Sequence, residues 1–98
     1  MWISGSGLFP SVRPGLVLRE LSEHLVIEDP LTRDKHALNS AAASLFLLCN
    51  GRRNAEDVAE FFALTFGEKK TSVEDKVRQV LQELVQKKVL VLRTLTAR

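Results

Sequence analysis

The sequence predicts an α+β domain in which a three-stranded antiparallel sheet is followed by three helices, an outline like a winged helix-turn-helix. Between residues 16 and 39, apolar residues recur with a period of about two, as is typical of strands. From about residue 40 to residue 88 they recur at the spacing of amphipathic helices. The chain has 98 residues, 45% of them apolar and 27% charged, which fits one folded domain.

Three segments are expected along the chain. Residues 1–11 are rich in Gly and Ser and predict a flexible lead-in, residues 12–92 form the domain, and residues 93–98 form a tail. The first residues lack the basic and apolar regions of a secretory signal. No stretch approaches the roughly 18 apolar residues that a membrane span needs. The single cysteine, Cys49, allows no intramolecular disulfide. We therefore expect a cytoplasmic protein without a membrane partner.

Three short strands are expected before the helices. The first covers residues 16–21, and the second covers residues 24–29, with Leu25 and Ile27 on one face. The third covers residues 35–39, "KHALN". Short segments rich in Ser, Asp and Pro separate these strands, as is usual for tight turns. Together they predict a small antiparallel sheet.

Two helices follow, each with its own capping residues. Asn39 or Ser40 can cap the first helix, which carries the run "AAASLFLLC" and is expected to end at Gly51. Asn54 can cap the second helix, which is expected to end at Gly67. The first helix is almost wholly apolar, and the second carries Val58, Phe61, Phe62 and Thr65 at helical spacing.

The third helix is the longest. Thr71 and Glu74 have the spacing of a capping box, and the helix is expected to reach about Lys88. Residues 89–94, "VLVLRT", fit either a short fourth strand or an apolar tail. The apolar residues of this helix recur at positions i, i+4, i+7, i+8 and i+11: Val73, Val77, Val80, Leu81 and Leu84.

Catalytic and metal-binding functions are not expected. General acid–base catalysis and metal binding need converging His, Cys, Asp or Glu side chains. His24 and His36 lie on different predicted strands without a paired carboxylate, and no HxxxH, CxxC, GxSxG or glycine-rich phosphate-binding motif is present. We therefore expect a protein that is not an enzyme, with no catalytic residue, no metal ligand and no cofactor.

Nucleic-acid binding is the alternative that the winged-helix outline raises. A recognition helix contacts DNA with its N-terminal end, yet the second helix opens with Glu56 and Asp57 and the third with Glu74 and Asp75. The net charge is only +2, and the basic residues are not interleaved with aromatic ones. A winged-helix nucleic-acid-binding protein is therefore retained only as the alternative.

Peptide binding fits the pattern better. An edge strand offers unpaired N–H and C=O groups that an extended peptide can complete, and residues 34–39 are the candidate edge. On the third helix, Leu81 and Val85 widen the apolar arc beside Arg78 and could form the wall of a groove. These two residues could equally pack on the sheet or the tail. The opposite flank of this helix carries charged residues: Lys76, Glu83 and Lys87.

Three stretches of the chain resemble the PqqD-like proteins in order and spacing. They are "RPGLVLREL", "HALNSAAASLFLLCNGRRNAEDVAEFF" and "VEDKVRQVLQELVQKKVL", and together they cover about residues 12–92. Asn50 stands where the family commonly has Asp, and Asn54 stands near a common Thr. Both replacements retain residues that suit turns and caps. PqqD-like proteins are small partners in making ribosomally synthesised and post-translationally modified peptides.

The resemblance implies a recognition element for a precursor peptide. Such a domain binds the leader segment of the precursor as an added strand beside its third strand and against its third helix. It then presents the leader to a modifying enzyme, often a radical SAM protein. Carried onto this chain, the main chain of the third strand and its preceding turn would pair with the leader: Arg33, Asp34, Lys35, His36, Ala37, Leu38 and Asn39. Side chains of the third helix would contact it: Val77, Arg78, Leu81 and Val85.

Two further expectations follow from the same residues. Arg78 and Lys35 would favour an acidic residue in the leader, since both carry positive charge. A third interpretation is a scaffold subunit whose sheet edge pairs with the enzyme or with a second copy, which would give a homodimer.

Overall fold

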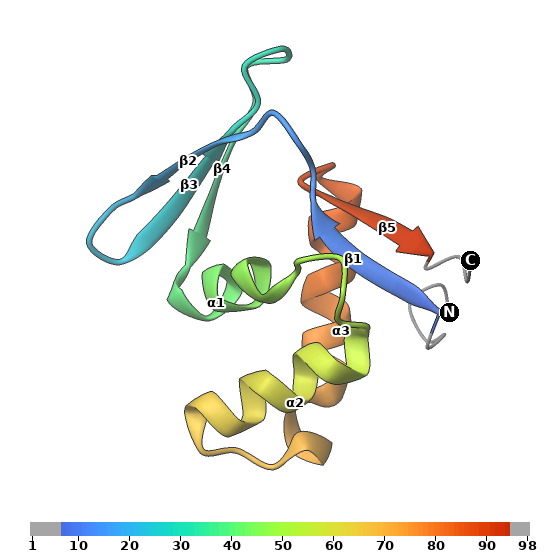
Figure 1. The fold of residues 1–98 in the computed structure, drawn as a ribbon. Coiled ribbons are helices and arrows are strands. Elements are labelled where there is room, and N and C mark those ends of the chain that lie inside the picture. Colours follow the sequence, from blue (N-terminus) through green and yellow to red (C-terminus); the bar gives the residue numbers. More distant parts are fainter. Residues whose placement is uncertain (1–6, 95–98) are drawn as a thin grey trace.

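The computed structural model describes residues 7–94, which form five strands and three helices (Figure 1). Three strands precede the helices in the predicted positions, and one further strand lies at each end of the described chain. The elements are β1 (Leu8–Val12), β2 (Val17–Glu20), β3 (His24–Glu28), β4 (Lys35–Asn39), α1 (Ser40–Leu48), α2 (Ala55–Phe66), α3 (Lys70–Gln86) and β5 (Leu90–Thr94).

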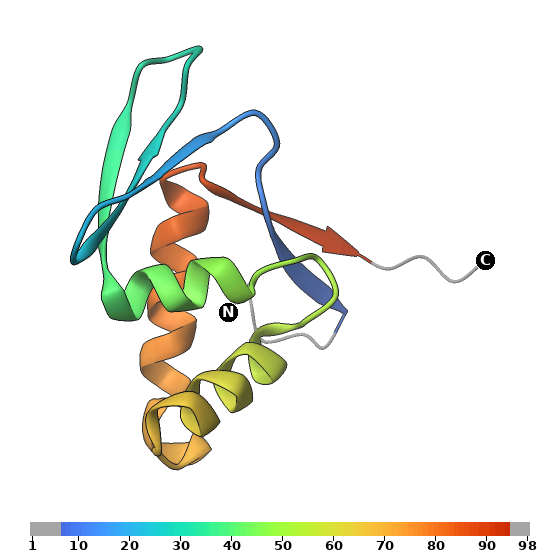
Figure 2. The ribbon, with the colours of Figure 1, turned by 60° about the vertical axis from the view of Figure 1, so that its left-hand side comes forward.

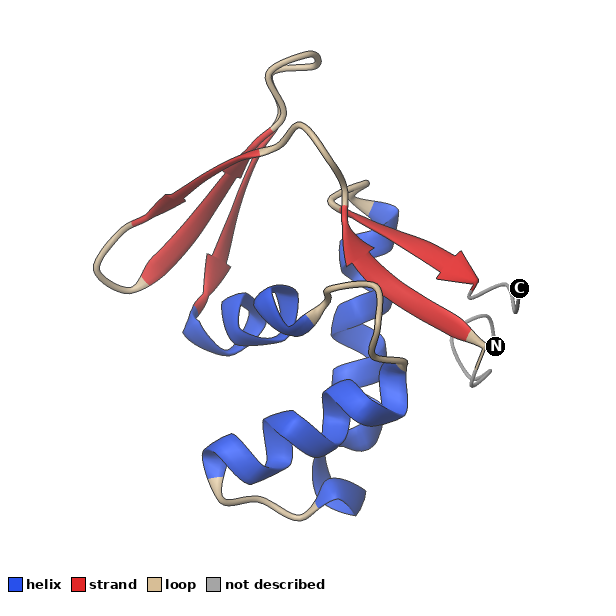
Figure 3. Ribbon diagram, viewed as in Figure 1, coloured by secondary structure: helices blue, strands red, loops and turns tan. Residues whose placement is uncertain are grey.

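The strands form two antiparallel sheets that lie on different sides of the helices (Figure 3). One sheet has the order β2-β3-β4, which confirms the predicted three-stranded sheet. The expectation that it would be the only sheet is wrong, because β1 and β5 form a second one. The fold is therefore α+β with two antiparallel sheets and three helices.

The expectation of a flexible lead-in over residues 1–11 is wrong for residues 8–11, which belong to β1; residues 1–6 lie outside the described part. A proline in a short run argues against a strand because it cannot donate a hydrogen bond. Pro10 lies opposite Leu92. Because the Arg13 N–H bonds the Val89 carbonyl, alternation in the ladder places Pro10 at a position that does not bond to β5. Its carbonyl accepts from Gly51 at 3.0 Å on the other side.

Residues 89–94 are expected from the sequence to form either a short strand or an apolar tail. The structure shows a strand, because β5 pairs with β1 along its whole length. The expectation of a tail over residues 93–98 is wrong for Arg93 and Thr94, which belong to β5; residues 95–98 lie outside the described part. Leu90 is only 1% exposed. This strand is part of the core rather than an apolar tail.

The caps of α1 and α2 follow the sequence. The Asn39 side chain accepts from the Ala42 N–H at 2.9 Å, and Asn54 and Asp57 form a reciprocal capping box. Gly67 ends α2 in the left-handed region, with a φ of 66°. Gly51 does not end α1, whose C-cap is Cys49. It has a φ of 80°, and a Cβ there would lie 3.4 Å from Ser11. Glycine at this position lets β1 pass close to the α1–α2 loop.

The predicted capping box of α3 is wrong. The helix begins at Lys70, with Lys69 as its N-cap, so Thr71 already lies inside the first turn. Lys70 forms an exposed ion pair with Glu56 of α2 at 3.6 Å. Glu74 does not reach back to the helix start, but forms an ion pair with Arg78 at 3.2 Å.

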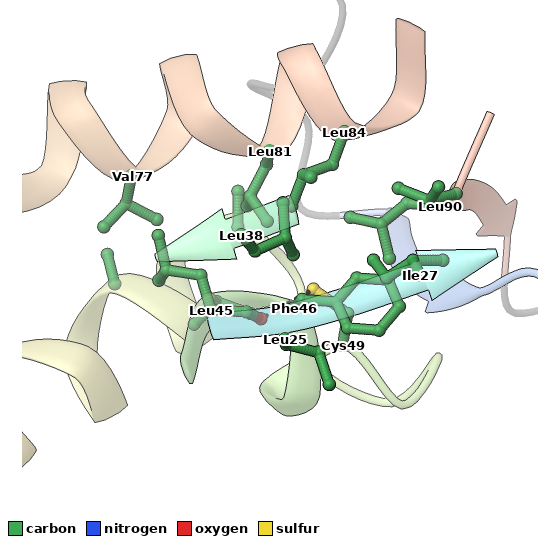
Figure 4. Close-up of a cluster of buried hydrophobic side chains, with 14 residues drawn as sticks. Leu25, Ile27, Leu38, Leu45, Phe46, Cys49, Val77, Leu81, Leu84 and Leu90 are labelled. Carbon is green, nitrogen blue, oxygen red and sulfur yellow. Dashed lines mark hydrogen bonds between the residues drawn. The ribbon is translucent and has the colours of Figure 1, made fainter. Parts of the chain in front are cut away.

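The core lies between the β2–β4 sheet and the helices, and its side chains come from both (Figure 4). Leu25 and Ile27 are both buried, as their alternation in β3 predicts. Phe46 of α1 is fully buried, and Leu81 and Leu84 point from α3 toward the sheet (Figure 4). This packing fixes α1 and α3 relative to β4.

Arg13 connects the two sheets at one end of the molecule. Its guanidinium forms an ion pair with Asp29, directly after β3, and donates to the Lys88 carbonyl at 2.6 Å, two residues before β5. Hydrogen bonds from the Leu31 N–H and from Arg13 lower the pKa of Asp29. The linker between β1 and β2 is thus tied to both the β3–β4 turn and the α3–β5 turn.

Leu90→Ala tests whether β5 belongs to the core. A buried leucine replaced by alanine costs about 2–5 kcal/mol, and we expect a loss of this size in the free energy of unfolding, measured by urea titration. Leu31→Ala is the matched control, because Leu31 is 89% exposed and should change stability by no more than about 0.5 kcal/mol. Equally small losses for both variants would contradict the packing of β5.

Candidate functional site

The free edge of β4 is the first part of the candidate site. The Asp29 N–H donates to the Asp34 carbonyl at 2.9 Å, so these residues begin the ladder between β3 and β4 as a bonded pair. Bonded and non-bonded pairs alternate in an antiparallel ladder. His36 and Leu38 therefore bond to β3, whereas Lys35 and Ala37 direct their N–H and C=O groups to the other edge. Within residues 7–94, no strand pairs with that edge.

A groove of about 410 Å³ lies beside this edge, between β4 and α3. The two elements run alongside each other in opposite directions (Figures 1 and 4). Helix α1 follows β4 directly and crosses α3 (Figure 2). The lining residues come from β4 (Ala37, Leu38, Asn39), α1 (Ala41, Ala42, Leu45), α2 (Phe62), α3 (Val73, Lys76, Val77, Val80, Glu83, Leu84) and the C-cap of α3 (Lys87).

The groove has an apolar floor and a charged rim. Leu38, Leu45, Val77 and Leu84 are buried and belong to the main core. Val73, Val80 and Phe62 are partly exposed and pack against that core. The charged lining residues all come from one flank of α3: Lys76, Glu83 and Lys87. An unpaired strand edge beside such a surface can accept an extended chain with apolar side chains.

The structure places the residues of the predicted edge in different environments. Ala37 and Leu38 line the groove, whereas Lys35 and His36 lie on the same strand without lining it. Asp34 is exposed and precedes β4, and its carbonyl is already bonded to Asp29. Arg33 lies in the β3–β4 turn with a φ of 66°. The part of the predicted edge that borders the groove is therefore residues 37–39.

Of the predicted residues on α3, only Val77 lines the groove. Leu81 is fully buried in the core. Val85 lines a separate depression, with Leu90 and Leu92 of β5 among its neighbours. Arg78 is absent from the groove lining, and its guanidinium pairs with Glu74. The apolar flank expected to face a ligand is occupied by packing within the domain.

Sequence reasoning misses the flank of α3 that does face the groove. The helical pattern places Val80 in the middle of the apolar arc, and it places Lys76 and Lys87 on the side away from the ligand. A usable signal is present in residues 89–94. A strand at these residues would pack against Leu81 and Val85 of α3. The side of α3 that carries Val80 would then remain exposed beside β4.

Catalytic and metal-binding groups do not gather in the described part of the chain. Residues 7–94 contain no group of three or more His, Cys, Asp or Glu side chains placed to hold a metal ion. Burial raises the pKa of Cys49 to about 12, and its thiol donates to the Leu45 carbonyl at 3.2 Å. Among the helices of residues 7–94, none is long and apolar enough to cross a membrane.

A model of a known protein family matches most of the chain. The family described as coenzyme PQQ synthesis protein D (PqqD) matches residues 24–90, which include β3, β4 and all three helices. No curated protein matches the chain. The family match therefore spans the β4–α3 groove.

Three solved structures are similar to the domain. The NMR structure of the PqqD truncation of Methylobacterium extorquens PqqCD is described as a functional, stand-alone recognition element for ribosomally synthesised and post-translationally modified peptides. It is 25% identical, with a TM-score of 0.72 over 91% of this chain and 94% of that one. TbiB1 in complex with the TbiA(beta) leader peptide is 16% identical, with a TM-score of 0.70 over 82% and 93% of the two chains. Lasso peptide synthetase B1 complexed with the leader peptide is 20% identical, with a TM-score of 0.69 over 84% and 96%. At these identities, the last two show a shared fold.

Cys49 should be inert in the folded protein. Alkylation requires the thiolate, and a pKa of about 12 leaves almost none at pH 8. We expect iodoacetamide to label the folded protein at least about a hundredfold more slowly than the urea-unfolded protein, whose thiol has the ordinary pKa of about 8.5. Mass spectrometry measures both rates. Similar rates would mean that Cys49 is accessible and ionised in the fold.

Proposed function

Because the chain belongs to the PqqD family, we propose that it is a peptide-binding protein that recognises the leader segment of a ribosomally made precursor peptide. The leader would add as a strand to the free edge of β4 and lie in the groove against α3. The protein would present the bound precursor to a modifying enzyme, for which a radical SAM protein is our proposal. The solved complexes of TbiB1 and lasso peptide synthetase B1, which share the fold, contain leader peptides and support this assignment.

One observation carries the proposal: an unpaired strand edge borders an apolar groove. Lys35 and Ala37 each direct an N–H and a C=O to the free edge, and Ala37 lies at the groove itself. An added strand would pair with these groups, while alternate side chains would point into the groove. The proposed role is recognition of the leader, without a chemical step of its own.

The energetics are sufficient for specific binding. Each main-chain hydrogen bond contributes about 0.5–1.5 kcal/mol net, and a buried aliphatic side chain contributes about 1.5–3 kcal/mol. A few such bonds with two apolar anchors offset the cost of ordering the peptide and reach micromolar affinity, which corresponds to about −8 kcal/mol. The main-chain bonds are independent of sequence, so the groove would determine which leader binds.

The proposed contact set differs from the set that the sequence suggests. From β4 we retain Lys35, Ala37 and Leu38, and from α3 we retain Val77. Val80 replaces Leu81 and Val85 as an apolar contact, because Val80 lines the groove and the other two do not. Lys76 and Lys87 replace Arg78 as the positive charges near the leader.

The winged helix-turn-helix likeness would instead favour nucleic acid. The sequence argues against nucleic acid partly because the third helix is expected to open with the acidic residues Glu74 and Asp75. That argument is weaker in the structure, because α3 begins with Lys70. The first turn of α2 nevertheless carries Glu56 and Asp57, the wrong charge for contact with phosphates. None of the similar solved structures is described as binding nucleic acid.

Amide NMR titration tests the proposal. The probes are synthetic peptides covering the N-terminal segments of short open reading frames beside the gene, and a random-sequence DNA duplex is the comparison. With the cognate peptide we expect shifts concentrated in residues 35–39 and on the groove flank of α3, at both low and moderate salt. Shifts seen only with DNA, and lost as salt rises through counterion competition, would contradict the proposal.

A matched pair of variants locates the contact on α3. Val80 and Val85 are both partly exposed valines of one helix, but only Val80 lines the groove. Val80→Gln should weaken peptide binding about tenfold by placing an amide against an apolar ligand, whereas Val85→Gln should leave the affinity within about twofold. Calorimetry measures both, with circular dichroism as the folding control. A larger loss of affinity for Val85→Gln would mean that the peptide contacts the Leu81 and Val85 side of α3 instead.

A further inference from the structure

The charges on the groove rim are available for a ligand. Lys76, Glu83 and Lys87 line the groove, and none of them forms an ion pair among residues 7–94. Arg78, the positive residue that the sequence favoured, already pairs with Glu74 at 3.2 Å. These three charges lie along the free edge of β4. A peptide bound there would be favoured by opposite charges at the matching positions and disfavoured by like charges.

The spacing of these charges sets distances along a bound strand. Lys76 on α3 and Lys87, the C-cap of this helix, are eleven positions apart, which corresponds to about 16 Å at 1.5 Å per helical residue. A strand advances about 3.3 Å per residue, so an extended peptide covers that distance in about five residues. Glu83 lies between them, about three strand residues from the level of Lys76. Because β4 and α3 run alongside each other (Figure 4), a strand added to β4 would also run along the axis of α3.

We propose that the groove selects a leader segment with two acidic side chains on the same face of the strand, four or six residues apart, a basic or neutral side chain between them, and apolar side chains facing the floor. The acidic groups would lie near Lys76 and Lys87, and the central one near Glu83. This inference rests on the proposed function and specifies the chemistry of its ligand. An acidic side chain at the central position would face Glu83 and be disfavoured.

The apolar part of the pattern comes from the groove floor. Leu38 and Leu84 are buried below the opening, and Val73, Val80 and Phe62 are partly exposed around it. These side chains offer a ligand no hydrogen-bonding group of their own. Since side chains of a strand alternate between two faces, apolar residues two positions apart would enter the groove together.

Selection from a random-sequence peptide library displayed on its encoding RNA tests the inference without requiring the natural leader. Wild-type protein and the double variant Lys76→Glu/Lys87→Glu would be used as separate baits. We expect wild type to enrich peptides with two acidic residues four or six positions apart around apolar residues, and the variant to enrich basic residues at those positions. In direct titration, exchanging both acidic residues of a selected peptide for lysine should weaken wild-type binding about fivefold to tenfold, as expected for two exposed charge pairs.

Arg19→Glu/Arg52→Glu is the matched control. It changes the net charge by the same amount at two exposed residues that do not line the groove, and it should retain the wild-type preference. Selected peptides that shift the amide signals of Ala37 and Val80 without any acidic enrichment would overturn the inference and leave the proposed function standing. If no selected peptide shifts those signals, the proposed function fails and the inference fails with it. A reversed preference in the control variant as well would assign the effect to net charge and also overturn the inference.

Discussion

The candidate site depends on the packing of Leu38 and Leu45 against α3. Both side chains are buried in the core that also holds Val77 and Leu84, and α1 begins at the residue after β4 ends. Strand β4 is therefore fixed on one side by β3 and below by α1, beside α3 but not covered by it. An exposed edge of this kind is usually a liability that proteins protect. Here the edge is short, and the groove beside it makes its unpaired groups accessible to an extended chain.

Helix α3 serves both sheets, and this division of its surface explains where a ligand can bind. Its Leu81 and Val85 side lies against the core and β5, and β5 is held by β1. Its Val73 and Val80 side adjoins the free edge of β4. Main-chain pairing on β4 would supply affinity for many extended peptides. The rim charges of α3 would then discriminate among them, in keeping with the general role of charge in specificity.

Local signals in the sequence predict most of the fold. The alternation in β3 and the Asn39 and Asn54 caps predict elements at nearly their observed positions, because each signal acts within a few residues. Strand β1 escapes such signals because its stability comes from pairing with a segment about eighty residues away, and because Pro10 argues against a strand unless its register is known. The sequence favours a different flank of α3 from the one that lines the groove for the same reason. Without β5 in place, the apolar arc of α3 gives no means to distinguish the side covering the core from the side facing a ligand.

Hydrogen exchange at individual amides tests the central claim most directly, namely that β4 offers its main chain to a bound strand. In the free protein, the amides of Lys35 and Ala37 should exchange rapidly, whereas His36 and Leu38 should be protected by their bonds to β3. Saturation with a cognate leader peptide should protect Lys35 and Ala37 and leave the other two unchanged. Unchanged exchange at Ala37 in a saturated complex, or new protection confined to β2 or β5, would contradict the account.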